Sequence, residues 1–112
     1  MLERESTFRL EHLGTDGSFK LSGEVDMAVS EGLVELVRGS MDGARDIVLD
    51  LSELSFMDSS GIHALIRINR LLDGRGRLIL QSPSPVVARV LEIVGADDFP
   101  NVEIRKGDAR GG

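Results

Sequence analysis

Two short apolar runs constrain the fold of this chain more than any other feature of its sequence. Residues 47–51 and 78–80 consist almost entirely of valine, isoleucine and leucine. Runs of this length and composition are typical of central strands that are buried on both faces of a sheet. Each run is followed by a segment in which apolar residues recur at helical spacing. Strands that alternate with helices predict an α/β domain with a mostly parallel sheet.

Weaker strand patterns occur near both ends of the chain, where apolar and polar residues alternate. The residues that define these segments are Phe8, Leu10 and His12, then Phe19 and Leu21, and finally Val102 and Ile104. Residues 14–17 are Gly-Thr-Asp-Gly, and an Asp-Gly pair supplies the positive φ angles of a hairpin turn. The predicted order is β-β-α-β-α-β-α-β, in a mixed, mostly parallel sheet of about five strands.

Three helices are predicted between the strands. Asp26 is suited to cap the first, whose apolar face is formed by Val29, Leu33, Leu36 and Val37.

The second helix begins near Ser59 and ends near Asp73. The third has Ser84 as its expected N-cap and Pro85 at its first position, and Gly95 is its expected end.

The composition predicts a single globular domain and excludes several functions. A chain of 112 residues is long enough for one domain. The net charge of −6 argues against general binding to nucleic acid or to anionic lipid. No apolar run approaches the length of a membrane span, about 20 residues, and charged residues stand where a signal peptide would be apolar. The absence of cysteine suits a reducing cytoplasm, where we expect the protein to act.

The junction Asp58-Ser59-Ser60-Gly61 is the most informative candidate site. It places two hydroxyls at the start of a helix, where backbone N–H groups and the helix dipole favour an anion. Such a junction can cap the helix, hold a nucleophile or present a serine for phosphorylation. Since Asp26 also follows a strand, we expect it to lie on the same rim of the sheet. Ser60 is the better candidate for a structural cap, and Ser59 for the residue whose charge state a partner detects.

Catalysis and metal binding have little support in the sequence. The glycine that opens a nucleophile elbow is missing before Ser59, which leaves a small serine hydrolase as a weak alternative. His63 lies four residues after Ser59, but Arg67 and Arg70 continue its helix face, as expected for a polar surface. No phosphate-binding glycine loop and no metal-ligand spacing occurs. We therefore expect neither a cofactor nor enzymatic activity.

Two isoleucines in the second helix leave an alternative open. Ala64, Leu65, Ile68, Leu71 and Leu72 form one apolar arc, and Ile62 and Ile66 fall outside it. Ile62 and Ile66 are either the edge of a wide core face or an exposed apolar ledge beside Ser59. An apolar ledge with a polar rim would be typical of a protein-binding site.

Residues 51–61, together with Gly23-Glu24-Val25-Asp26, closely resemble the anti-sigma factor antagonists of the STAS domain family. The resemblance covers residues 6–106 and implies a single STAS domain with helices mainly on one face of the sheet, with flexible termini at 1–5 and 107–112. It implies binding to an anti-sigma factor that is also a serine kinase, which frees a sigma factor. It also implies that ATP-dependent phosphorylation of Ser59 ends this binding and that a serine phosphatase restores it.

The resemblance also implies which residues surround the phosphorylation site and meet the partner: Asp26, Asp58, Ser60, Gly61, Ile62, His63 and Ile66. At position 63 the chain has histidine where similar proteins often have a small residue, which bears on the identity of the partner. The alternative is a STAS subunit of another assembly, such as a sensory or lipid-transport complex. A monomer and a weak dimer both remain compatible with the sequence.

Overall fold

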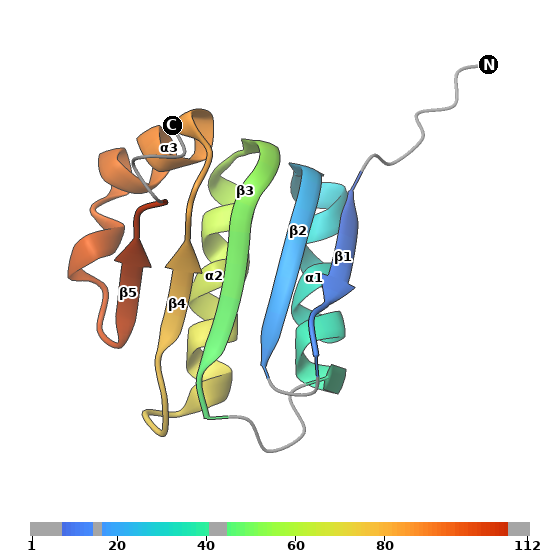
Figure 1. The fold of residues 1–112 in the computed structure, drawn as a ribbon, viewed down its shortest axis with the longest axis vertical. Helices are drawn as coiled ribbons and strands as arrows, with labels where there is room; N and C mark the ends of the chain where they lie inside the picture. Colours follow the sequence, from blue (N-terminus) through green and yellow to red (C-terminus); the bar gives the residue numbers. More distant parts are fainter. Residues whose placement is uncertain (1–7, 15–16, 41–44, 108–112) are drawn as a thin grey trace.

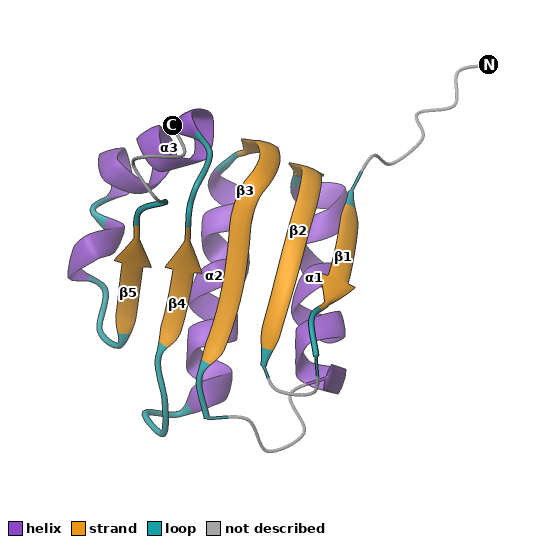
Figure 2. Cartoon of the chain, viewed as in Figure 1, coloured by secondary structure: helices purple, strands orange, loops and turns teal. Residues whose placement is uncertain are grey.

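The computed structural model describes residues 8–14, 17–40 and 45–107. These residues form one sheet with helices beside it (Figures 1 and 2). The expected hairpin turn at residues 14–17 lies partly outside the described residues. The expected flexible termini also lie outside them, except for Gly107.

The sheet confirms the predicted α/β class and topology. Its strands are β1 (Arg9–His12), β2 (Ser18–Val25), β3 (Ile47–Met57), β4 (Leu78–Gln81) and β5 (Val102–Arg105). They lie in the order β1-β2-β3-β4-β5. The β1–β2 pair is antiparallel, and the other three pairs are parallel. The carboxyl ends of four strands therefore lie at one end of the sheet, the upper end in Figure 1.

Helices cover one face of this sheet. The helical segments are α1 (Met27–Ser40), α2 (Ser59–Leu72), α3 (Pro85–Val94) and a short 3-10 helix, η1 (Ala96–Asp98). In Figure 1, α1 and α2 lie behind the sheet, and α3 lies near the upper end of β4. Strands and helices share one apolar core, which includes Phe19, Leu49, Val37, Ile68 and Leu91. None of the described residues that are buried is polar or charged.

Strand β3 is longer than the apolar run that predicted it. The strand continues to Met57, although Ser52, Glu53, Ser55 and Phe56 are exposed. Pairing with β2 maintains the extension, because Val25 lies opposite Met57 at its end. The apolar run ends before the strand does, because the second half of β3, residues 52–57, has exposed and mostly polar side chains on one side. In residues 47–51, by comparison, every side chain is buried or half-buried.

A glycine in β2 makes this long pairing possible. The register shifts between Gly23 and Glu24, and Gly23 has a φ of +91°, a conformation that a side chain disfavours. The Ser55 hydroxyl donates a 3.0 Å hydrogen bond to the Gly23 carbonyl oxygen. The Gly23-Glu24-Val25-Asp26 segment therefore aligns the ends of β2 and β3.

The helix boundaries agree well with the sequence, but the apolar face of α1 differs from the expected one. In α1 the buried residues are Leu33, Val34 and Val37, and Leu36 is 51% exposed.

In α3 only Val87 and Leu91 are buried. Ser84, Pro85 and Gly95 occupy the predicted N-cap, first and C-cap positions. The Ser84 hydroxyl donates to the Leu54 carbonyl oxygen instead of to its own helix, which fastens the start of α3 to β3.

Candidate functional site

The two aspartates meet on one rim of the sheet, as the sequence predicts. Val25 and Met57 are paired residues of neighbouring parallel strands, and Asp26 and Asp58 directly follow them. Each aspartate is the only residue between its strand and the next helix. The N-termini of α1 and α2 consequently begin side by side at the carboxyl end of the sheet.

Asp58 caps α2, so the expectation that Ser60 is the cap is wrong. Asp58 Oδ1 accepts hydrogen bonds from the Ser60 N–H at 2.9 Å and from the Gly61 N–H at 3.4 Å. The Ser60 hydroxyl donates to the same carboxylate oxygen. This hydroxyl bond, with the two backbone donors, holds the pKa of Asp58 below its usual value. A carboxylate accepts three donors here, whereas a Ser60 hydroxyl would satisfy one.

Asp26 has the corresponding role at α1. Its Oδ1 accepts from the Ala28 N–H at 3.0 Å and from the Val29 N–H at 3.2 Å. The cap predicted at this position is confirmed. The acidic group of each junction is therefore engaged by N–H groups of its own helix.

Ser59 differs from its neighbour in both exposure and bonding. It is exposed at the first position of α2, and its hydroxyl makes no hydrogen bond to any other residue that the structure describes. Ser60 is half-buried and its hydroxyl is bound to Asp58. Of the two serines, only Ser59 presents an accessible hydroxyl without a structural task.

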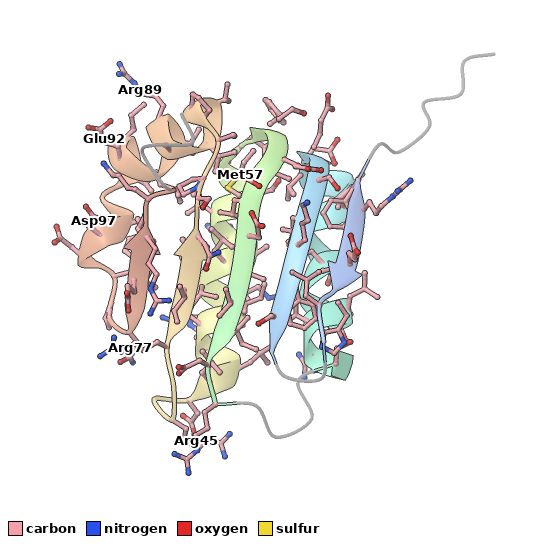
Figure 3. The ribbon with its side chains drawn as sticks, viewed as in Figure 1. Arg45, Met57, Arg77, Arg89, Glu92 and Asp97 are labelled. Atoms are coloured by element: carbon pink, nitrogen blue, oxygen red, sulfur yellow. The ribbon has the colours of Figure 1, made fainter. Side chains whose placement is uncertain are left out.

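Gly61 and Ile62 lie inside the protein and not on the surface. Gly61 is buried against Met57 and Val25. The side chain of Met57, with its sulfur atom, is labelled near the upper end of β3 in Figure 3. Ile62 is 6% exposed and belongs to the core. For Ile62 the core-edge alternative is correct, and the exposed-ledge alternative is wrong. Both residues position the first turn of α2 and leave no surface for a partner to touch.

A groove of about 620 Å³ extends from Ser59 between α1 and α2. Ile66 is half-buried: it packs against the core, as the core-edge alternative expects, and it also lines the groove, as the ledge alternative expects. His63 is exposed and also lines the groove. The other lining residues are Met27, Ser30, Glu31, Ser60, Ala64, Arg67 and Arg70. The groove thus combines the free hydroxyl with apolar and cationic side chains.

Sequence reasoning missed the α1 side of this groove. Met27 is 76% exposed, directly after Asp26, and Ser30 and Glu31 continue the same wall. The sequence did contain a signal for this wall of the groove: if the strands before Asp26 and Asp58 pair in parallel, the residues after Asp26 lie next to those after Asp58. Without the register of β2 against β3, however, Met27 is indistinguishable from a core methionine.

Within residues 8–14, 17–40 and 45–107, no hydrogen bond joins the Ser59 hydroxyl to His63. The same residues contain no group of three or more His, Asp or Glu side chains able to hold a metal ion. None of their helices is long and apolar enough to cross a membrane.

Comparison with known protein families identifies the class of protein to which this fold and this pair of helix starts belong. The chain belongs to the STAS domain family, which matches residues 7–109. Its relatives include anti-sigma factor antagonists. The anti-sigma-B factor antagonist of Staphylococcus aureus strain NCTC 8325 is 31% identical over 85 residues, which cover 74% of this chain and 79% of that protein. The anti-sigma F factor antagonist of Paenibacillus polymyxa is 35% identical over 83 residues, covering 68% of each chain.

Solved structures agree with this assignment. The anti-sigma factor antagonist SpoIIAA in its unphosphorylated form superposes with a TM-score of 0.70 at 26% identity, covering 94% of this chain and 92% of that one. SpoIIAA from Bacillus in its phosphorylated form superposes with a TM-score of 0.59, also at 26% identity, covering 94% and 96%. Proteins of this group are regulatory binding proteins and not enzymes, so a serine hydrolase is no longer a competing interpretation.

Proposed function

We propose that this protein is an anti-sigma factor antagonist that binds an anti-sigma factor serine kinase in the cytoplasm and so releases a sigma factor. Phosphorylation of Ser59 by that kinase ends the binding, and a serine phosphatase restores it. One observation carries the proposal: Ser59 has a free, exposed hydroxyl at the mouth of the α1–α2 groove, while the Ser60 hydroxyl is bound to Asp58. The existence of SpoIIAA in a phosphorylated form supports it.

The domain itself is expected to tolerate the phosphate. A phosphoserine adds about −1.5 to −2 charges, and Asp26 and Asp58 on the same rim repel it. The N-terminus of α2 offsets part of this repulsion by about 0.3–1 kcal/mol. Since Ser59 is exposed, no buried contact is lost. The phosphate therefore acts on the surface that the partner meets and leaves the fold in place.

The predicted partner-binding residues divide into two groups by position. His63 and Ile66 line the groove and are available for direct contact. Asp26, Asp58, Gly61 and Ile62 fix the starts of the two helices, and Ser60 both binds Asp58 and lines the groove. A partner seated over Ser59 excludes water from its hydroxyl, so a phosphate there adds bulk and an unpaired charge to the interface.

A phosphorylation assay tests the proposal directly. The kinase that co-purifies with the chain from its native cytosol is incubated with ATP and with wild type, Ser59→Ala or Ser60→Ala. Mass spectrometry is expected to find phosphate on Ser59 in wild type and in Ser60→Ala, and none in Ser59→Ala. Phosphate that persists in Ser59→Ala and disappears in Ser60→Ala would refute the assignment.

Binding measurements then separate a switch from a change in stability. Ser59→Asp is expected to weaken the complex at least about tenfold, which corresponds to about 1.4 kcal/mol. The melting temperature of the free protein should stay within a few degrees of wild type. An unaltered affinity, or a co-purifying assembly without a serine kinase, would favour the interpretation as a STAS subunit of another complex.

A further inference from the structure

The α1–α2 groove differs in charge from the rest of the molecule. The whole chain has a net charge of −6. The residues that line the groove include Arg67 and Arg70 against the single carboxylate of Glu31, which gives +1 with His63 neutral. The remainder of the chain therefore carries −7. A locally cationic groove on an acidic protein is a selective surface for a partner.

The cationic groups of the groove form a row on α2. His63, Arg67 and Arg70 follow one another at i, i+4 and i+7, so they share one side of the helix, and all three are exposed. Helical side chains lean toward the N-terminus of their helix, which for α2 is the end that carries Ser59. The row therefore leads from the interior of the groove toward the phosphorylation site proposed above.

Neither arginine of this row has an ion-pair partner among the residues that the structure describes. Lys20, Arg38, Arg77 and Arg105 pair with glutamates of the same chain, whereas other arginines in the described part of the chain, such as Arg89, resemble Arg67 and Arg70 in having no ion pair. A guanidinium group presents a planar fork that matches the two oxygens of a carboxylate. The guanidinium groups of Arg67 and Arg70 are thus available to pair with carboxylates of a ligand.

We propose, building on the function proposed above, that the partner docks an acidic amphipathic segment in this groove. Its carboxylates pair with Arg67 and Arg70, and its apolar side chains cover Met27 and Ile66. The apolar groove residues fit a protein segment, since Met27 is 76% exposed and Ile66 half-buried. A nucleic acid is disfavoured because its phosphates would meet the −7 of the surrounding chain.

Charge reversal tests this docking mode on the partner that co-purifies with wild type. The double variant Arg67→Glu/Arg70→Glu is expected to weaken binding about tenfold or more in a calorimetric titration. Arg89→Glu is the matched control and should stay within about twofold of wild type. Arg89 is exposed on α3, outside the groove, and its side chain points away from the sheet in Figure 3. Thermal unfolding of each variant verifies that the fold persists.

A model peptide tests the same chemistry without the partner. A helical peptide with a glutamate face and a leucine face is titrated into 15N-labelled protein, next to a twin in which lysine replaces each glutamate. The glutamate peptide is expected to shift the amide signals of residues 63–70, and the lysine peptide to leave them in place. Equal shifts with both peptides, or none at these residues, would overturn the proposal.

The outcomes also separate this inference from the proposed function. If Arg67→Glu/Arg70→Glu binds the partner as well as Arg89→Glu does, the acidic segment is refuted, while a loss of binding in Ser59→Asp still supports the switch. If the double variant fails to bind and Ser59→Asp binds normally, the acidic segment stands and the switch is refuted. Raising the salt concentration from about 50 to 500 mM should weaken wild type more than the double variant.

Discussion

A single added methyl group at position 61 is expected to destabilise this protein. Gly61 is buried in the first turn of α2. A Cβ atom at this position would lie 2.4 Å from Met57 Cγ, 3.2 Å from Met57 Sδ and 3.3 Å from Val25 Cγ1. Met57 is only 2% exposed, so its side chain cannot move out of the way without repacking within the core. Overpacking of a core in this way costs about 1–3 kcal/mol.

The chain supplies a matched control for this substitution. Gly32 lies exposed within α1, and a Cβ atom there would have no neighbour within 4 Å. Alanine is favoured over glycine inside a helix by about 0.5–1 kcal/mol, so Gly32→Ala should stabilise the protein. The gain in helix propensity from Gly61→Ala is at most as large as that from Gly32→Ala. The free energy of unfolding of Gly61→Ala should therefore lie about 1–3 kcal/mol below that of Gly32→Ala.

Urea unfolding measures the difference between the two variants. With an m-value of about 2 kcal/mol per molar, a difference of 2 kcal/mol separates the midpoints by about 1 M. Repeating Gly61→Ala in a Met57→Ala background removes the atoms that the new Cβ meets, so the penalty should largely vanish in this double-mutant cycle. Equal midpoints for Gly61→Ala and Gly32→Ala would refute the argument that packing against β3 requires a glycine here.

Further predictions concern the Asp58 cap of α2 and the hydrogen bond from Ser84, at the start of α3, to the Leu54 carbonyl oxygen. Asp58→Ala removes the cap of α2 and should lower the free energy of unfolding by about 0.5–2 kcal/mol, whereas Asp58→Asn keeps an acceptor and should retain most of it in a urea titration. Because the Ser60 hydroxyl lowers the pKa of Asp58 in the folded state, the stabilisation is complete above the unfolded pKa of about 3.9 and is lost as the pH falls through the lower folded pKa. The stability difference between wild type and Asp58→Asn should therefore shrink below about pH 4, and a constant difference down to pH 2 would contradict this. Ser84→Ala removes the hydrogen bond to the Leu54 carbonyl and should cost about 0.5–1.5 kcal/mol more than Ser52→Ala at an exposed position, where equal midpoints would count against it.

The topology could be predicted from the sequence because each strand and helix has a local signal. The apolar run at residues 47–51 and the cap-and-stop residues Ser84 and Gly95 depend only on their own neighbours in the chain. The apolar faces were less predictable, since burial depends on what lies opposite. Leu36 has the correct helical spacing, but Val34, on the other flank of Leu33 and Val37, is buried in its place.

The candidate site shows the same division. Asp26 and Asp58 were expected on one rim because each follows a strand, and the structure confirms it. The sequence predicted different roles for Ser59 and Ser60, but it assigned the cap to Ser60, and only the atomic positions show that Asp58 is the cap and binds the Ser60 hydroxyl. The carboxylate of Asp58 accepts hydrogen bonds from two backbone N–H groups and from the Ser60 hydroxyl. The Ser59 hydroxyl is therefore the one that remains free.

The direct passage from β3 to α2 also determines how an enzyme can approach Ser59. Many kinases bind a flexible, extended peptide in a cleft. Here only Asp58 separates β3 from α2, so the chain on either side of Ser59 is held in regular secondary structure and cannot extend. A kinase that modifies Ser59 has to recognise an assembled three-dimensional surface. Denaturing the domain would therefore destroy the substrate and not expose it, and only correctly folded copies of the chain would be able to receive the signal.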